Sequence, residues 1–286
     1  MTTVPSGFET WIGRRRESED VATERLAASF RAILEPHLAE MPDGVCPLGL
    51  HWCLSPEIAG MADLGGDGHP ANNRHLPPVP LPRRMWAGGV VEIAGDIQIG
   101  DRVRRVSTIR DIARKQGRSG ELWFVSIDHV HETGCGPAVR ERQDLVYREA
   151  APPGAPAAKT AAPEAPLVPR TSTMASEIDT TPTLLFRYSA VTFNGHRIHY
   201  DEPYARQVEG YPGLVVHGPM QATLLLNLAA RAKGTGRLRM EYRGVAPAIA
   251  GNRLRLCAGA AGGELWSEGP AGQIHMEAKA TLLTPA

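Results

Sequence analysis

The sequence predicts an α+β fold in which two similar units each wrap an antiparallel sheet around a long helix. Three observations predict it. A Pro/Ala-rich segment at residues 150–166 divides the 286-residue chain. Each part then shows the same order, a helix followed by strand-like segments. Residues 96–104 also parallel residues 247–255, with Gly100 and Gly251 at equivalent positions of two predicted hairpins. Two such units could pair edge to edge into one continuous sheet.

The Pro/Ala-rich segment sets the predicted domain boundaries. Its prolines exclude both a strand ladder and an unbroken helix, so we expect it to run extended over the surface. The predicted domains are residues 1–149 and residues 183–286, joined by a linker at residues 150–182.

The first domain opens with a predicted helix at residues 20–38. Asp20 is its candidate N-cap. Four strands are predicted at residues 89–93, 101–109, 122–131 and 138–147. Glycine-containing turns at residues 115–120 and 132–136 separate the later strands. The helix shows an apolar stripe at helical spacing, formed by Val21, Leu26, Phe30, Ile33 and Leu34.

The second domain repeats this order in shorter form. An irregular polar segment at residues 188–211 precedes a predicted helix at residues 219–233. This helix is apolar on most sides and should therefore be buried. The strands predicted after it are residues 238–244, 253–258, 264–268 and 273–283.

Composition excludes several classes of function. The 31 basic and 31 acidic residues cancel, which leaves no electrostatic footprint for nucleic acid or an anionic membrane. No stretch approaches the ~20 apolar residues of a membrane span, and the N-terminus has no secretory pattern. The four cysteines show no Cys-x-x-Cys spacing and indicate no disulfide framework. We therefore expect a cytoplasmic protein without nucleic-acid or membrane partners.

Polar residues concentrate just before the buried helix. Asn194, His196, His199 and Asp201 fall within eight residues, and Gly218 then precedes the apolar run. Such side chains can position and deprotonate a water. The free N–H groups of a helix start can stabilise a developing oxyanion. This combination indicates a catalytic site.

These residues resemble a known signature. Residues 188–205 and the Leu-Val-Val-His-Gly at residues 214–218 are similar to motifs of MaoC-like (R)-specific enoyl-CoA hydratases, which have the hotdog fold. The sequence looks closer to a subgroup with mesaconyl-C4-CoA and itaconyl-CoA hydratases and 3-hydroxyacyl-thioester dehydratases. Residues 81–89 and 117–125 resemble the degenerate first hotdog of that subgroup. The resemblance implies a double hotdog.

One departure changes the roles that the resemblance implies. The family's catalytic aspartate aligns with Asn194, and its asparagine aligns with His196. Asparagine cannot accept a proton at neutral pH, so the base and proton shuttle should be His199, which aligns with the catalytic histidine. Asn194 would hold the water, and His196 would be a second proton carrier or a structural residue. Gly218 is the predicted oxyanion donor, because Pro219 has no N–H.

The remaining site candidates are less specific. Asp201 is more typical of a helix N-cap than of a catalyst. Arginine pairs suit a carboxylate or a CoA phosphate, and a histidine just before a helix could contact substrate or only pack beneath the helix. The candidate substrate-binding residues are Arg83, Arg84, Arg197 and His217.

A metal site is the alternative interpretation of this cluster. His196, His199, Asp201 and His217 are metal-ligating residue types, but their spacing matches no strong zinc pattern and no cysteine lies nearby. We therefore predict no metal and no redox cofactor, with coenzyme A entering as part of the substrate.

The first domain carries no matching cluster. The Leu-His-Trp-Cys of residues 50–53 stands where the second domain has Val-His-Gly, and no polar run precedes it. We expect this domain either to shape the acyl pocket or to be purely structural.

The predicted function is an acyl-CoA hydratase or dehydratase that adds water across the α,β double bond of a short enoyl-CoA. The subgroup resemblance favours mesaconyl-C4-CoA or itaconyl-CoA, hydrated to citramalyl-CoA. The alternatives are a dehydratase of monocarboxylic 3-hydroxyacyl thioesters on CoA or acyl carrier protein, a thioesterase of the same fold, and a non-catalytic acyl-CoA-binding subunit. A homodimer is a further expectation, because this fold commonly pairs its sheets.

Overall fold

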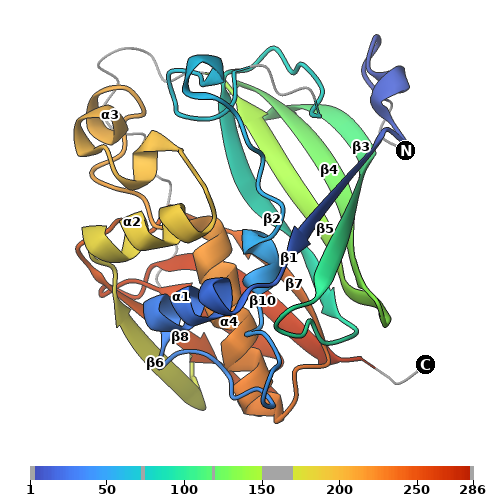
Figure 1. Cartoon of the computed structure of the whole chain (residues 1–286). Coiled ribbons are helices and arrows are strands. Elements are labelled where there is room, and N and C mark those ends of the chain that lie inside the picture. Colours follow the sequence, from blue (N-terminus) through green and yellow to red (C-terminus); the bar gives the residue numbers. More distant parts are fainter. Residues whose placement is uncertain (1–3, 72–74, 118–119, 150–169, 284–286) are drawn as a thin grey trace.

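The computed structural model describes residues 4–71, 75–117, 120–149 and 170–283. They form one ten-stranded antiparallel sheet that curves around a central helix (Figure 1). The strands are β1 (Arg15–Val21), β2 (Arg83–Ile93), β3 (Arg102–Gly117), β4 (Gly120–Thr133), β5 (Gly136–Arg148), β6 (Met174–Asp179), β7 (Leu238–Gly244), β8 (Arg253–Ala258), β9 (Glu264–Glu268) and β10 (Ile274–Leu282). The α-helices are α1 (Glu24–Leu34), α2 (Pro182–Val191), α3 (Glu202–Gln207) and α4 (Gly218–Lys233).

The sheet is symmetric about its centre. The strand order is β1-β3-β4-β5-β2-β7-β10-β9-β8-β6, so β2 and β7 join two halves of the same topology. The predicted continuous sheet of two similar units is therefore confirmed.

The two copies of the predicted repeat are similar in their backbone hydrogen bonds as well as in sequence. Gly100 and Gly251 both have positive φ, +99° and +85°. The N–H of Gly100 donates to Ala22 O, and that of Gly251 donates to Thr180 O, each at 2.8 Å. The predicted hairpins are wrong, however. Gln98 and Ile249, each two residues before its glycine, instead form isolated β-bridges. Their partners are Val45 and Val215, which lie shortly before the central helix position of each half.

Helix α4 forms the core of the second half. Every residue from Met220 to Ala230 is buried, and the strands β7–β10 pack around it. It ends at Gly234, which adopts the left-handed conformation that favours glycine at a helix C-terminus (φ +67°). The predicted buried helix at residues 219–233 is confirmed.

The first half differs from the prediction at the central helix. Where the second half has the 16 residues of α4, the first half has only the four-residue 3₁₀ helix η2 (Leu50–Cys53). The inner faces of β3, β4 and β5 are therefore not filled by a helix, and they line a cavity instead.

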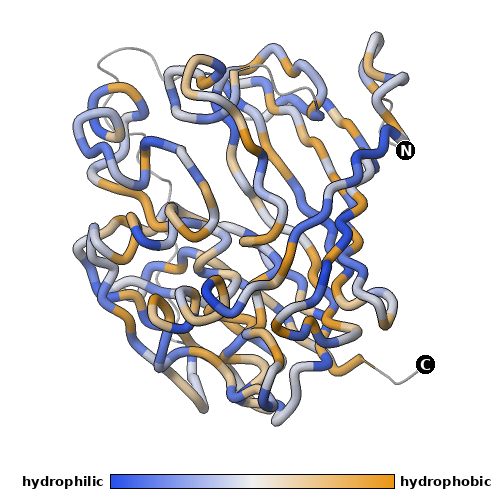
Figure 2. Tube along the Cα trace, viewed as in Figure 1, coloured by the Kyte–Doolittle hydropathy of each residue, from blue (hydrophilic) through white to orange (hydrophobic). Residues whose placement is uncertain are grey.

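The N-terminal helix also differs from the prediction. Residues 15–21 form the edge strand β1, and α1 begins only at Glu24, with the Thr23 side chain accepting from Leu26 N–H. Asp20 is not the cap, because its carboxylate accepts from the N–H groups of Val21 and Ser55. Figure 2 shows the reason: β1 is largely hydrophilic and carries no apolar alternation that would predict a strand.

The other predicted elements agree well with the structure. Strands β7, β8 and β9 have the predicted bounds, and β2–β5 are longer than predicted. Within the predicted irregular segment, the structure has the end of α2 and all of α3. Of the predicted linker, residues 150–169 lie outside the described residues, while β6 within its later part pairs with β8.

Two further expectations concern the whole chain. Within the described ranges, no helix combines the length and apolar character needed to cross a membrane. The four cysteines, Cys46, Cys53, Cys135 and Cys257, are free thiols.

Candidate active site

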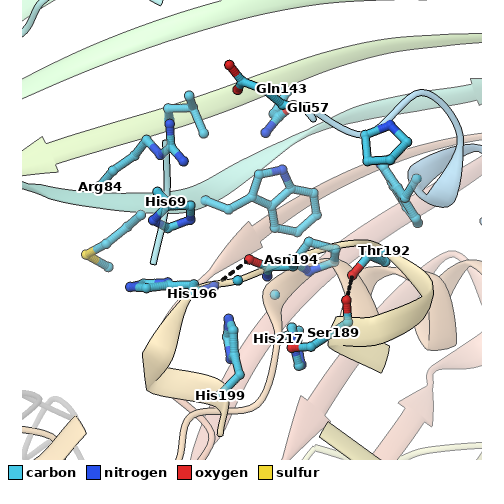
Figure 3. A pocket seen from close by; sticks show the side chains of 18 of the residues that line it. Glu57, His69, Arg84, Gln143, Ser189, Thr192, Asn194, His196, His199 and His217 are labelled. Carbon is cyan, nitrogen blue, oxygen red and sulfur yellow. Dashed lines mark hydrogen bonds between the residues drawn. The ribbon is translucent and has the colours of Figure 1, made fainter. Parts of the chain in front are cut away.

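A cavity of about 930 Å³ lies between the two halves (Figure 3). Its lining includes Asn194, His196, His199 and Gly218 from the second half. The first half contributes the inner face of its sheet and a loop at residues 64–70. The structure therefore brings the residues of the predicted catalytic cluster to one cavity.

The turn after α2 fixes Asn194. Phe193 has a positive φ of +51°, which turns the chain so that Asn194 N–H donates to Ser189 O at 2.8 Å. The Asn194 Oδ1 accepts from the N–H of His196 at 3.0 Å. Because a backbone N–H can only donate, the amide oxygen is occupied and the Nδ2 group remains to donate. Asn194 can therefore hold an oxygen atom but cannot take up a proton.

Asp201 is placed as predicted. It is the N-cap of α3, and its Oδ1 accepts from Tyr204 N–H at 3.1 Å. Its Oδ2 accepts from Arg197 Nη2 at 2.7 Å, and this contact lowers the pKa of the carboxyl group. The carboxylate is therefore engaged by α3 and Arg197, outside the cavity.

His199 is held in one tautomer. Its Nδ1 lies 2.7 Å from the carbonyl oxygen of Val215, so Nδ1 must carry the proton and Nε2 has a free lone pair. The ring stacks on His217, with centroids 3.6 Å apart. Burial lowers the pKa of His199 to about 4, which keeps the ring neutral at pH 7. A neutral imidazole with a free Nε2 is suited to act as a base.

His217 lies beneath His199. It is fully buried, and its Nε2 lies 2.8 Å from the Ser189 hydroxyl. Burial lowers its pKa well below the ordinary value. This placement suits support of His199 better than contact with substrate.

The N-terminus of α4 lies against an aromatic wall. Gly218 is packed on Trp86, and a Cβ added at Gly218 would lie 2.8 Å from Cε3 of that ring. Trp86 itself stacks on Tyr242, with centroids 4.8 Å apart. The N–H groups in the first turn of a helix have no intrahelical acceptors, so this end of the cavity can stabilise negative charge.

The three candidate arginines have different surroundings. Arg83 forms a buried ion pair with Glu209 at 2.6 Å. Arg197 binds Asp201 and the carbonyl of Gly66, and it does not line the cavity. Arg84 lines the cavity and lies beside His69 (Figure 3). Of the three, Arg84 is best placed to meet a ligand.

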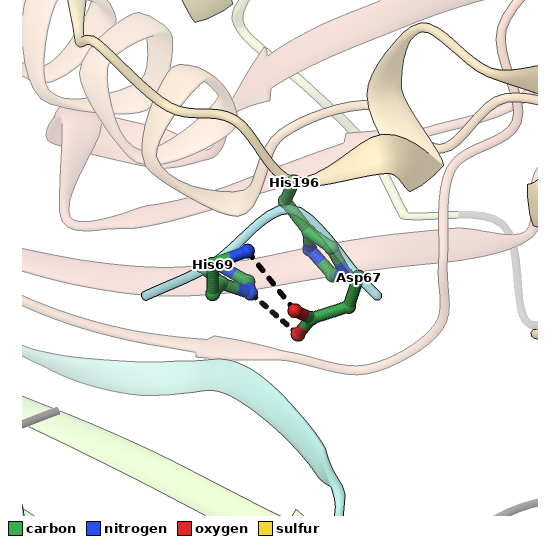
Figure 4. A group of neighbouring side chains, drawn as sticks. All are labelled: Asp67, His69 and His196. Carbon is green, nitrogen blue, oxygen red and sulfur yellow. Dashed lines mark hydrogen bonds and ion pairs between the residues drawn. The ribbon is translucent and has the colours of Figure 1, made fainter. Parts of the chain in front are cut away.

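Sequence reasoning missed a second cluster, formed by Asp67, His69 and His196 (Figure 4). The Asp67 Oδ2 lies 2.8 Å from His69 Nδ1, and the His69 ring faces His196 at a centroid distance of 4.3 Å. The three donor atoms lie within 4.8 Å of one another, as in metal sites. However, the Nδ1 of His69 already bonds to the carboxylate, so we interpret the group as a hydrogen-bonded pair beside His196. The only local signal was an Asp-x-His within a glycine-rich stretch.

Sequence reasoning also missed a polar inner chamber in the first half. Side chains on η2, β3, β4 and β5 line the cavity there, namely the buried His51, His129, His131 and Glu141 and the partly buried Arg105. Among the described residues, His51 Nε2, His131 Nδ1 and Arg105 Nε have no hydrogen-bond partner. Burial raises the pKa of Glu141 to about 7. Buried polar groups without partners are costly, which indicates that a polar ligand or water meets them.

Comparison with known sequences gives consistent matches. Residues 49–250 match the family described as hydroxyacyl-thioester dehydratase type 2. The mesaconyl-C(4)-CoA hydratase of Chloroflexus aurantiacus is 41% identical over 278 residues, which cover 95% of this chain and 96% of that protein. The mitochondrial hydroxyacyl-thioester dehydratase type 2 of Schizosaccharomyces pombe is 38% identical over 89 residues, 30% of this chain and 29% of that protein.

Comparison with solved structures supports the fold. HtdX of Mycobacterium tuberculosis aligns with a TM-score of 0.67 at 18% identity, over 94% of this chain and 100% of that one. A MaoC-like dehydratase from Phytophthora capsici aligns with a TM-score of 0.66 at 13% identity, over 97% and 98%. Another M. tuberculosis protein, described as a double hotdog fold, aligns with a TM-score of 0.54 at 13% identity, over 95% and 96%.

Proposed function

This chain belongs to the hydroxyacyl-thioester dehydratase type 2 family of MaoC-like hydro-lyases, and we propose that it hydrates a short, branched dicarboxylyl-CoA. It is an enoyl-CoA hydratase or dehydratase with the double hotdog fold. The proposed substrate is mesaconyl-C4-CoA or itaconyl-CoA, with citramalyl-CoA as product. One observation carries the proposal: a single cavity is lined by His199, Asn194 and the first residues of α4.

The lining of the cavity supports a short polar acyl group. A long alkyl tail would lie against His129, His131 and Glu141 and would offer their polar atoms no partner. A substrate carboxylate could instead accept charge-assisted hydrogen bonds from Arg84. The relative with 41% identity is named for a substrate of this type.

The N-terminus of α4 would stabilise the enolate. The N–H of Gly218 would donate to the thioester oxygen as negative charge develops there, and the helix dipole acts in the same direction. Trp86 packs directly on Gly218 and would help to exclude water from this oxygen.

His199 and Asn194 would handle the water. The Nδ2 of Asn194 would donate to the water oxygen, and the Nε2 of His199 would accept the water proton as the O–Cβ bond forms. The π electrons of the double bond then move toward the thioester oxygen. When this enolate collapses, Cα takes a proton and the imidazole returns to its neutral form. The atoms of water and enoyl ester are all retained in the 3-hydroxyacyl product.

A panel of esters tests the proposal. We would follow the enoyl absorbance and the free thiol for mesaconyl-C4-CoA, itaconyl-CoA and crotonyl-CoA. The proposal expects loss of the enoyl absorbance, fastest with a dicarboxylyl ester, without thiol release. Thiol release would instead indicate a thioesterase. Tight binding of the esters without turnover would indicate a non-catalytic acyl-CoA-binding subunit.

A monocarboxylic substrate, on CoA or on acyl carrier protein, is the second candidate. The 38% identity over 89 residues to the S. pombe dehydratase favours it. A preference for crotonyl-CoA over both dicarboxylyl esters in the same panel would select this candidate.

A further inference from the structure

Because position 194 is an asparagine, the catalytic segment offers no free carboxylate. Asn194 cannot exchange a proton, and Asp201 is engaged by α3 and Arg197. The nearest partner of His199 is a backbone carbonyl, and its neighbour His217 is another buried imidazole. A proton taken up by His199 would therefore create a buried cation with no adjacent negative charge.

A loop of the first half delivers a carboxylate to this place. The backbone oxygen of Asp67 accepts from Arg197 N–H at 2.9 Å, and Gly66 O accepts from Arg197 Nη1 at 2.8 Å. Gly68 and Gly195 lie back to back: a Cβ added at Gly68 would lie only 1.9 Å from Gly195 O. The two glycines therefore let the loop dock directly on the catalytic segment.

The loop orients His69 as an acid or base. Asp67 accepts from His69 N–H through Oδ1 at 3.0 Å and bonds to His69 Nδ1 through Oδ2 at 2.8 Å. The other ring nitrogen, Nε2, makes no bond to this carboxylate. The side chain of His69 lines the cavity and is 20% exposed. A carboxylate that orients an imidazole is the arrangement by which enzymes stabilise a developing imidazolium.

A row of rings connects this pair to His199. The centroid of His69 lies 4.3 Å from that of His196, and His196 lies 5.5 Å from His199. His196 therefore stands between the carboxylate-backed histidine and the predicted base (Figure 3).

We propose that His69, oriented by Asp67, is a second acid–base residue of this active site and supplies the carboxylate-backed function that Asn194 lacks. The inference rests on the proposed hydratase function. As water oxygen bonds to Cβ, Nε2 of His199 accepts the released proton and passes it through His196 to Nε2 of His69, where Asp67 stabilises the imidazolium through Nδ1–H. The proton returns from His69 to Cα as the enolate collapses. No net proton is gained or lost.

The charges around His69 set the direction of its titration. Burial lowers the pKa of His69, and the hydrogen bond that its Nδ1–H donates to Asp67 raises the pKa against that effect. Arg84 lowers the pKa, while Glu57 raises it. Removing the Asp67 charge should therefore lower the pKa of His69, and removing the Arg84 charge should raise it.

Replacement of His69 is the first test. We expect His69→Ala to lower kcat for the preferred ester by roughly 10² or more, since loss of a general base costs ~10²–10⁴ in rate. Added imidazole should restore part of the rate, which a purely structural role would not allow. The matched control is His37→Gln, a histidine that bonds to Ser176 outside the cavity. A His69→Ala variant with the rate of wild type would overturn the inference.

The pH profile tests the role of Asp67 as a positioning residue. If His69 acts as a base, activity rises with pH as the ring loses its proton. Asp67→Asn should then move this acid limb to lower pH and reduce kcat, whereas Arg84→Gln should move the limb to higher pH. Asp63→Asn is the control, an exposed carboxylate at the end of the short 3₁₀ helix (Met61–Asp63) that precedes this loop. An unmoved acid limb in both site variants would contradict the assignment.

Two further outcomes would have a different meaning from the results above. If wild type hydrates no ester, the proposed function fails, whereas normal hydration with an active His69→Ala variant defeats only the inference. Loss of wild-type activity on treatment with a chelator, restored by Zn²⁺ or Fe²⁺, would show that the cluster holds a metal and would also overturn the dyad.

Discussion

Gly218→Ala is the sharpest perturbation of the predicted oxyanion site. The added Cβ would lie 2.8 Å from Cε3 of Trp86, about 0.6 Å closer than the 3.4 Å at which ordinary contact begins. The ring cannot easily retreat, because it stacks on Tyr242 and meets Trp52 edge-on at a centroid distance of 6.1 Å. The start of α4 must therefore shift. Losing one oxyanion donor costs ~10²–10³ in kcat, so we expect a decrease of about 10².

The assay separates this effect from a general loss of stability. Overpacking should lower the free energy of unfolding by ~1–3 kcal/mol, which urea titration can measure. Steady-state kinetics on the folded variant then give kcat. Gly236→Ala is the matched control, because its Cβ would make only ordinary contacts with Leu48. A folded Gly218→Ala variant with the kcat of wild type would refute the role of this helix start.

Three further predictions address stability and specificity. Asn227→Leu breaks the bond to Leu48 O at 3.0 Å and leaves buried groups unpaired, so urea unfolding should show a loss of roughly 2–5 kcal/mol. Arg84→Gln should raise KM for mesaconyl-C4-CoA by about tenfold or more and leave KM for crotonyl-CoA unchanged. Burial raises the pKa of Glu141 from 4.5 to about 7, so the folded protein holds a proton there that the unfolded chain releases. Stability should therefore fall as pH rises through that window, and Glu141→Gln should flatten the dependence in melting experiments.

In the second half, the buried helix and the strands after it could be predicted from the sequence, whereas β6, α2 and α3 could not. Helix α4 is apolar on most sides because the strands surround it, and this pattern is visible without the structure. The local cluster of Asn194, His196 and His199 could also be singled out, since these residues lie close together in the chain, and all three line one cavity. The resemblance to MaoC-like hydratases is confirmed by the family match over residues 49–250.

The first half could not be predicted so well, because the burial of its strand residues depends on the absence of a long central helix. His129, His131 and Glu141 occur on strands whose sequence pattern predicts one polar, solvent-exposed face. Since η2 replaces the long helix, that face instead lines a cavity, and a polar residue in it is buried. Strand β1 was also missed, because its charged residues hide the alternation of an ordinary strand.

Asp67 and His69 were missed for a different reason. They meet His196 only because the loop docks through Gly68 on Gly195, far along the chain. No spacing between residues that are close in the sequence predicts such a contact. The glycines themselves were visible, but without an alignment nothing marked them as a docking point.

Hydration of the preferred dicarboxylyl-CoA by wild type and by His199→Ala tests the central claim most directly. Both proteins would be compared by enoyl absorbance and free thiol, with folding checked by circular dichroism. The account predicts that wild type hydrates the ester without thiol release and that His199→Ala, folded and still able to bind the ester, is slower by ~10²–10⁴. A folded His199→Ala variant that hydrates the ester as fast as wild type would contradict the account.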